Sequence, residues 1–266
     1  MTLILNIIVL VLVFVFGAII GAFLATIISR LPKKERLLSD STPRKELLSP
    51  RSLLIEALTG MLALVSYLAF MPPTGFLLRE GLAYTFLTTA GQAGLMAAWL
   101  PFELSGYTGA LLALLLVFAL LCVLVVVTFI DASTREIPNA LCLWIVAFGL
   151  VSVVIGPTAA LAWYDHLIGA LAISVPLILL AYACAGSFGL GDVKLMAAAG
   201  LFLGWQLVLV AAVIGIIVGG VYGLYLLVIR KKGRKEHFAF GPALCAGIVL
   251  SLFAGQPIIS WYLSLF

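Results

Sequence analysis

The sequence predicts an all-α, polytopic membrane protein with about eight transmembrane helices. Apolar residues fill 64% of the 266 positions and charged residues only 10%, whereas soluble domains have about 45–50% and about 25%. Long apolar runs recur along the chain, and about 20 such residues in a helix cross the hydrocarbon core of a bilayer. The runs lack the alternation of barrel strands, so the backbone must satisfy its hydrogen bonds within helices. This composition excludes both a soluble domain and a disordered chain.

Eight apolar runs bounded by charged residues, Pro or Gly are the predicted helices. They cover residues 2–29, 53–71, 110–130, 138–155, 167–184, 193–204, 206–229 and 240–265. We interpret the first as a retained span, because it lacks a basic segment before it and is too long for the core of a signal peptide. The run 193–204 is too short to cross the membrane straight. We expect it to be a half-length helix whose ends are shielded by other helices.

Basic residues gather in two short loops and set the predicted topology. Twelve of the 15 Lys and Arg lie in residues 30–51 and 230–235. Membrane proteins keep such loops in the cytoplasm, so we expect both to face that side. Counting helices from these loops places Asp131 and Asp192 at the cytoplasmic face as well.

The same count leaves room for one crossing between the second helix and Asp131. The run 110–130 is nearly all Leu, Val and Ala, whereas 82–100 carries several Thr, a Gln and two Gly. We therefore place 76–104 on the outer face as an interfacial or re-entrant segment. The chain then divides into an N-terminal membrane region, 1–109, and a six-helix domain, 110–266, that carries both aspartates.

Three acidic residues lie at the ends of apolar helices, where a charge is costly. They are Glu56, Asp131 and Asp192. Each has an ordinary interpretation: Glu56 as a partner of Arg51, and the aspartates as helix-end charges, with Asp192 capping its helix. The alternative is that they carry chemistry.

Asp131 and Asp192 are expected on one side of the membrane at similar depth. Two converging carboxylates share a proton, leaving one as general base and one as general acid, as in aspartyl proteases. Gly189 and Gly191 precede Asp192 without side chains, which leaves room for an extended substrate backbone, although glycines also serve helix packing. Lys194 follows Asp192 by two residues and need not share its helix face.

Five segments in this order resemble the type IV prepilin leader peptidases, which belong to the G-x-G-D intramembrane aspartyl proteases. The segments are Gly21–Phe23 with Ser29–Pro32, Pro50–Gly60, Ile130-Asp131 with Ile137–Asn139, Gly189–Leu195, and Phe240–Leu244. The resemblance implies an enzyme that cuts the basic leader from prepilin-like or pseudopilin substrates at the cytoplasmic face of the bacterial inner membrane, in type IV pilus or type II secretion systems. It assigns catalysis to Asp131 and Asp192, with Gly189, Gly191 and Lys194 supporting the motif. The implied partners are these substrates and membrane lipid, and no nucleic acid.

One departure from the family concerns cysteine. Many members carry two C-x-x-C pairs in the first cytoplasmic loop and also methylate the new N-terminus. Here residues 30–51 hold no Cys, and the four cysteines, Cys122, Cys142, Cys184 and Cys245, stand singly in apolar stretches. We expect them to be small core residues. Zinc is therefore not expected, proteolysis needs no cofactor, and S-adenosylmethionine is expected only if methyl transfer is retained.

The sequence leaves other classes of function open. A transporter or channel also places rare carboxylates in membrane helices as ion sites, but no internal repeat relates the two halves of this chain. A presenilin-type protease and a non-catalytic relative that acts in pilus or secretion assembly are two further alternatives. His166 and His237 are isolated in sequence, so we assign them no metal or catalytic role.

Overall fold

A computed structural model describes residues 2–33, 49–70, 107–155, 162–183, 189–228 and 239–265. Every regular element in these ranges is helical, which confirms the all-α prediction. The predicted outer-face segment 76–104, most of the two basic loops, Cys184 and His237 lie outside the described residues.

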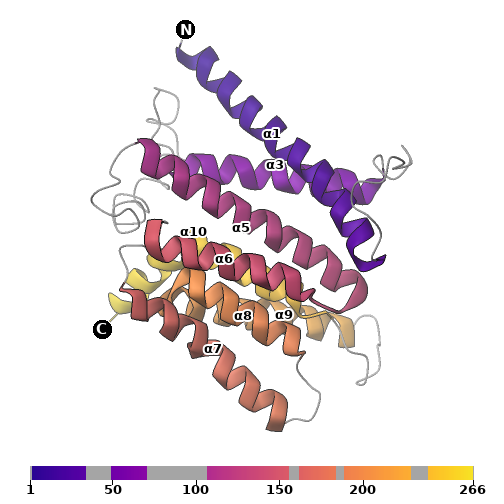
Figure 1. Ribbon diagram of the computed structural model, residues 1–266, viewed down its shortest axis with the longest axis vertical. Helices are drawn as coiled ribbons and strands as arrows, with labels where there is room; N and C mark the ends of the chain where they lie inside the picture. The colour runs from indigo at the N-terminus through magenta and orange to yellow at the C-terminus, as the bar shows by residue number, and fades with distance from the viewer. Residues whose placement is uncertain are drawn as a thin grey trace. The chain divides into compact units, whose positions relative to one another are not determined.

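Eight α-helices and one short 3-10 helix make up the described residues (Figure 1). They are α1 (Thr2–Arg30), η1 (Leu31–Lys33), α3 (Pro50–Phe70), α5 (Tyr107–Thr134), α6 (Asn139–Ile155), α7 (Trp163–Ala183), α8 (Leu190–Leu203), α9 (Trp205–Val228) and α10 (Gly241–Leu263). Each α-helix matches one predicted run to within four residues at either end.

Within the described ranges, six of these helices are long and apolar enough to cross a membrane. They are α1, α3, α5, α7, α9 and α10. Helix α6 is shorter, and α8 has only 14 residues. At 1.5 Å per residue α8 spans about 21 Å, less than the roughly 30 Å of a bilayer core. The chain is a multi-span helical membrane protein, and its predicted half-length helix is confirmed.

The chain forms two compact units, and the boundary between them falls inside α5. The N-terminal unit is Met1–Val126 and the C-terminal unit is Val127–Phe266. The division predicted from the sequence, at residues 109 and 110, stays a prediction.

In the N-terminal unit, α1 crosses α3 closely (Figure 1). Gly17 and Gly21, four residues apart on α1, face Thr59 and Gly60 of α3 with no space for a side chain between the backbones. Small residues at this spacing let membrane helices approach each other closely. The apolar residues of α1 that α3 does not cover are exposed, as expected for side chains that face lipid.

In the C-terminal unit, α8 is the central helix and lies between α6 and α7 (Figure 1). Ten of its 14 residues are buried. Gly200 of α8 meets Gly169 of α7 backbone to backbone, and Gly149 of α6 contacts Leu201. A turn at Gly204, with φ 79°, connects α8 directly to α9. Helix α10 packs along α9, where Gly247 meets the backbone of Ala211.

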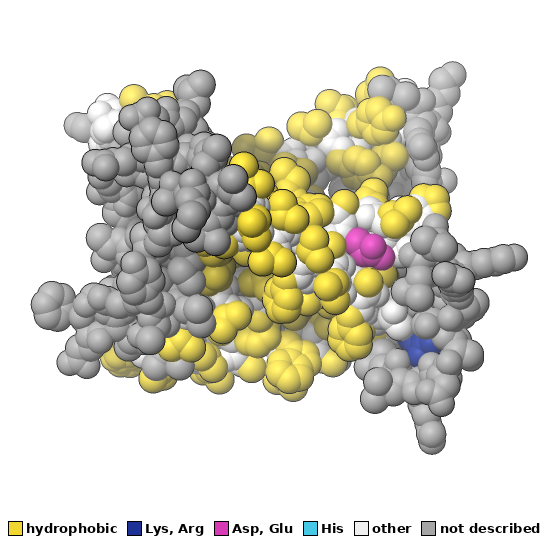
Figure 2. Space-filling view, turned by 90° about the horizontal axis from the view of Figure 1, so that it is seen from above, with side chains coloured by type: hydrophobic (Ala, Val, Ile, Leu, Met, Phe, Trp, Pro, Cys, Tyr) yellow, Lys and Arg dark blue, Asp and Glu magenta, His cyan; other side chains and the backbone are white. Residues whose placement is uncertain are grey.

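Apolar side chains dominate the outside of the molecule as well as its core. Hydrophobic residues cover most of the described atoms on the face that Figure 2 shows. A water-soluble protein rarely exposes contiguous apolar surface on this scale. The surface therefore fits a hydrocarbon environment, and the polar groups buried beneath it must have other partners.

Candidate active site

Asp131 lies in the last turn of α5 and is only 4% exposed. Its Oδ2 accepts a hydrogen bond of 2.9 Å from the backbone N–H of Gly241, the first residue of α10. An N–H at the positive end of a helix stabilises a negative charge on the oxygen that it contacts. Helix α5 ends just beyond, where Arg135 takes a left-handed backbone conformation with φ 59°.

Asp192 lies in the first turn of α8 and is 9% exposed. The N-cap residue is Gly189, and no side-chain hydrogen bond caps the helix. The ordinary interpretation of Asp192 as a helix cap is therefore wrong. Its backbone N–H donates to the carbonyl oxygen of Gly189 at 3.1 Å, so the main chain itself closes this first turn.

The fold brings the two aspartates close enough for the charge of one to act on the other. Helix α8, which carries Asp192, is not one of the six helices long enough to cross the membrane. Burial and, after it, the charge of Asp131 raise the pKa of the Asp192 carboxyl to about 6. Asp192 therefore holds a proton nearer to neutral pH than an exposed aspartate does. The N–H of Gly241 lies on Asp131 and stabilises the charge of its ionised form. The two carboxyls thus differ in their surroundings, because the hydrogen bond from a helix N-terminus lies on Asp131.

Two further residues lie beside the aspartates and were not predicted as part of the site. Cys245 of α10 is 3% exposed, hydrogen-bonds with Thr128 of α5, and lies within electrostatic range of both carboxyls. Thr128 precedes Asp131 by three residues and Cys245 follows Gly241 by four, so each shares a helix face with its partner. This spacing is the signal in the sequence that identifies them once the two helices are known to meet.

Gly189 and Gly191 differ in how closely their surroundings approach them. A Cβ at Gly189 would lie 3.5 Å from Oδ2 of Asp192, an ordinary contact. A Cβ at Gly191 would lie 3.2 Å from Cβ of Ile137, in the segment between α5 and α6. Neither glycine has a positive φ. The absent side chain of Gly191 lets Ile137 pack closely against α8, and that of Gly189 leaves room beside Asp192.

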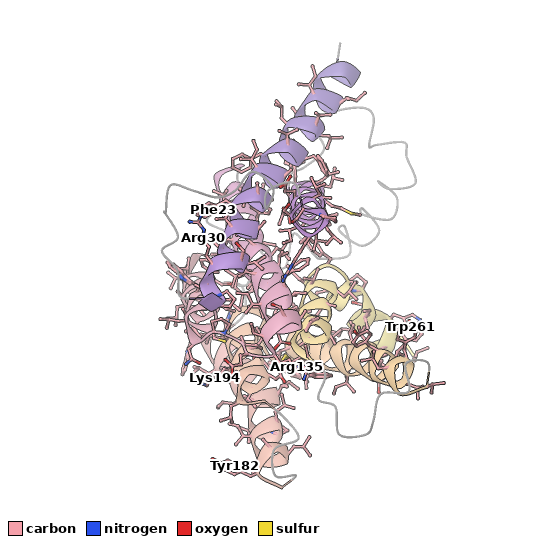
Figure 3. All side chains as sticks on the ribbon, turned by 90° about the vertical axis from the view of Figure 1, so that its right-hand side faces the viewer. Phe23, Arg30, Arg135, Tyr182, Lys194 and Trp261 are labelled. Atoms are coloured by element: carbon pink, nitrogen blue, oxygen red, sulfur yellow. The ribbon has the colours of Figure 1, made fainter. Side chains whose placement is uncertain are left out.

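Lys194 is exposed and does not bind either aspartate. Its Nζ donates to Oδ1 of Asn139 at 3.0 Å, which joins the first turn of α8 to the start of α6. Figure 3, seen from the right-hand side of Figure 1, labels Lys194 and Arg135 at this end of the C-terminal unit. The ends of α5, α6, α8 and α10 that meet here form one polar site in an apolar unit.

The remaining residues considered from the sequence lie elsewhere or serve packing. Glu56 is in α3 of the N-terminal unit, half-buried beside Gly21. His166 is fully buried, and its Nδ1 donates to the carbonyl oxygen of Leu201 at 2.8 Å, tying α7 to α8. Cys142 and Cys245 are buried core residues as predicted, and Cys122 is half-buried. Within the described residues no three His, Cys, Asp or Glu side chains gather as a metal site.

We expect Asp192→Asn to raise the melting temperature at about pH 8 and to change it little near pH 4. A carboxyl whose pKa is raised on folding lowers stability as pH rises from its unfolded value, about 4, through about 6, because the folded state binds the proton more tightly. The neutral amide escapes this cost, on the order of 3 kcal/mol. Thermal unfolding in detergent at both pH values measures the effect. Asp165→Asn in α7 is the matched control, and an equal gain at both pH values contradicts the explanation.

Comparisons with known proteins bear on the whole chain. Residues 118–224 match the model of the type IV leader peptidase family. A prepilin leader peptidase/N-methyltransferase of Bacillus subtilis is 29% identical over 253 residues, covering 95% of this chain and 97% of the relative. Another of that name, from Aeromonas salmonicida, is 30% identical over 281 residues, covering 95% of this chain and 93% of the relative.

A third similar protein of that name, from Burkholderia pseudomallei, is 32% identical over 276 residues, covering 91% of this chain and 84% of the relative. No solved structure matches the chain. The match to the family model includes both Asp131 and Asp192, and the first two relatives align over nearly their whole length. The chain belongs to the type IV leader peptidase family.

Proposed function

We propose that this protein is an intramembrane aspartyl endopeptidase that removes the basic leader of prepilin-like or pseudopilin proteins. The observation that carries the proposal is the pair Asp131 and Asp192, both buried and within electrostatic range of each other in an apolar unit. An aspartyl protease needs two such carboxyls with one proton between them. Membership of the family supplies the substrate class.

The two carboxyls have different roles in the proposed reaction. Asp131, whose charged form is stabilised by the Gly241 N–H, is the general base. Asp192, whose pKa is raised to about 6, is the general acid. Like charges at close range cannot both ionise, so the pair holds one proton, and the Gly241 N–H favours the charge on Asp131.

The proton transfers balance over the two steps of peptide hydrolysis. Water attacks the scissile carbonyl carbon while its proton passes to Asp131 and the proton of Asp192 passes to the carbonyl oxygen. In the second step the C–N bond breaks, the leaving amine takes the proton from Asp131, and a hydroxyl of the diol returns a proton to Asp192. Both carboxyls are then in their starting states.

The N-terminus of α8 is the proposed place of substrate approach. Without a side chain at Gly189, an extended backbone can come close to Asp192, whereas Gly191 packs against Ile137. Lys194 is the basic residue of α8, two positions after Asp192, and its Nζ is held by Asn139 on the exposed side of the helix. We propose that it contacts the substrate or lipid headgroups. The substrate's hydrophobic helix must lie in the membrane beside the enzyme to bring its cleavage site to the pair.

We place this site at the cytoplasmic face of the bacterial inner membrane. The support is the positive charge of residues 30–51 and 230–235, which membrane proteins retain in the cytoplasm. A basic leader is made in the cytoplasm and stays there for the same reason. The two aspartates of the enzyme and the leader of the substrate would then lie on the same, cytoplasmic side of the membrane.

N-Methylation of the new N-terminus is part of the relatives' printed names. Such methyl transfer uses S-adenosylmethionine as the donor. The first loop of this chain lacks the Cys pairs of many members, and we propose peptidase activity as the function that does not depend on them. The mass of the reaction product decides whether methyl transfer accompanies it.

The test is cleavage of a synthetic peptide with a basic leader followed by a hydrophobic segment. Purified enzyme in lipid vesicles, with and without S-adenosylmethionine, is expected to cut at the end of the leader, and mass spectrometry reads the cut and any added methyl group. Absence of cleavage by a folded enzyme would exclude the proposal. The alternative of a transporter or channel receives no support from the comparisons.

A further inference from the structure

The backbone of Gly241 lies against the carboxylate of Asp131. Its N–H makes the 2.9 Å hydrogen bond to Oδ2, and a Cβ at this position would lie 2.6 Å from the same oxygen. Real Cβ atoms essentially never approach a heavy atom so closely. Any side chain here therefore forces Asp131 to move and weakens the bond that orients it.

Helix α9 holds Gly241 in place through the preceding residue. Phe240 is the N-cap residue of α10, and its ring lies on Gly219 of α9, where a Cβ would overlap ring carbons. Gly219 is buried. The next residue, Gly220, is exposed, and a Cβ added there would meet nothing within 4 Å. Of these two neighbouring glycines of α9, Gly219 is covered by the ring of Phe240, whereas Gly220 has open space around it.

A second contact fixes α5 to α10 one turn further into the unit. Thr128 of α5 and Cys245 of α10 are hydrogen-bonded side chain to side chain. This contact lies on the same face of α10 as Gly241, and Phe240 is bonded directly to Gly241, so both contacts bear on the position of its N–H. The titratable groups that face Asp131 within the described residues are Asp192 of α8 and Cys245 of α10.

We propose that Gly219, Phe240 and Gly241 are positioning residues for the general base. The ring of Phe240 seats on Gly219 and holds the N–H of Gly241 on Oδ2 of Asp131, so that the other carboxylate oxygen faces the attacking water. This inference rests on the proposed function and names residues that do not touch the substrate. Misplacing a catalytic group by about 1 Å costs about 100-fold in rate.

The experiment compares Gly219→Ala with Gly220→Ala in the peptide cleavage assay. Both changes add one methyl group to α9 and raise its helix propensity by a similar amount. We expect Gly219→Ala to lower kcat by about 10-fold or more with KM within about twofold, and Gly220→Ala to match wild type. The acidic limb of the kcat profile is expected to move to higher pH in Gly219→Ala, because the ionised Asp131 loses its hydrogen bond.

A double-mutant cycle with Phe240→Leu tests the route of the effect. The smaller side chain leaves room for the added methyl, so Gly219→Ala is expected to cost much less in the Phe240→Leu background. Gly241→Ala, the direct test of the hydrogen bond to Asp131, is expected to lose about 100-fold in kcat. If that variant does not fold, the double-mutant cycle tests the same inference without it.

Equal kcat and an unchanged pH profile in Gly219→Ala and Gly220→Ala overturn the inference and leave the proposed function intact. The inference is also overturned if the losses in kcat from Gly219→Ala and Phe240→Leu simply add in the double variant. If wild type does not cleave, or Asp131→Asn cleaves like wild type, then the proposed function is wrong and the inference falls with it. The two failures are distinguished by the wild-type and Asp131→Asn reactions run in the same assay.

Discussion

Replacing either Asp131 or Asp192 by Asn is expected to remove prepilin cleavage almost entirely, by at least about 10²–10⁴-fold in kcat. Asn keeps the size of the side chain but neither accepts a proton from water nor donates one to the carbonyl oxygen. Because each carboxyl is buried, no outside group replaces it. The measurement is single-turnover cleavage of the leader peptide, followed by mass spectrometry.

The double variant is expected to be little slower than either single variant. Residues that act as one catalytic unit lose their joint contribution when either is removed, so their effects do not add. Asp165→Asn, an aspartate in the first turn of α7, provides the matched control and is expected to cleave at the wild-type rate. Full activity in one of the two site variants would contradict the assignment of that residue.

Apolar runs were enough to predict the helices, and their ends were harder to place. Helix α5 continues four residues beyond the run 110–130, through Asp131 to Thr134, and α7 begins at Trp163 rather than 167. Polar residues end an apolar pattern but do not end a helix whose backbone is still paired. Asp131 thus lies inside a helix turn, and the sequence placed it after the helix.

The two carboxylates of the candidate site could be predicted from the sequence, but the groups that surround and orient them could not. Charge scarcity and helix counting brought Asp131 and Asp192 to one side of the membrane. The hydrogen bond from the Gly241 N–H could not be predicted, because every residue except proline has a backbone N–H. Its partner, Asp131, is also 110 positions away in the sequence. Cys245 was predicted as a packing residue, and only the meeting of α5 and α10 places it beside the pair.

Gly200→Ala is the second large effect expected, on stability rather than on chemistry. In an open helix position Ala is more stable than Gly by about 0.5–1 kcal/mol. At Gly200 the new Cβ overlaps the carbonyl oxygen and carbon of Gly169, backbone atoms that cannot rotate away. Separating α7 from α8 also strains the His166 bond to Leu201. We expect a net loss of about 2 kcal/mol, seen as a melting temperature lower by about 5 °C in detergent.

The control again is Gly220→Ala, which has the same change of residue in a helix with open space around it and should melt no lower than wild type. Because α8 carries Asp192 at its far end, a shift of α8 away from α7 is expected to lower cleavage as well. Gly169→Ala approaches the same contact from the other side, with its Cβ 2.5 Å from the Gly200 carbonyl oxygen, and should reproduce both losses. If both variants melt at the wild-type temperature, α8 is not fixed by this contact, and the position of Asp192 depends on α6 and Lys194 instead.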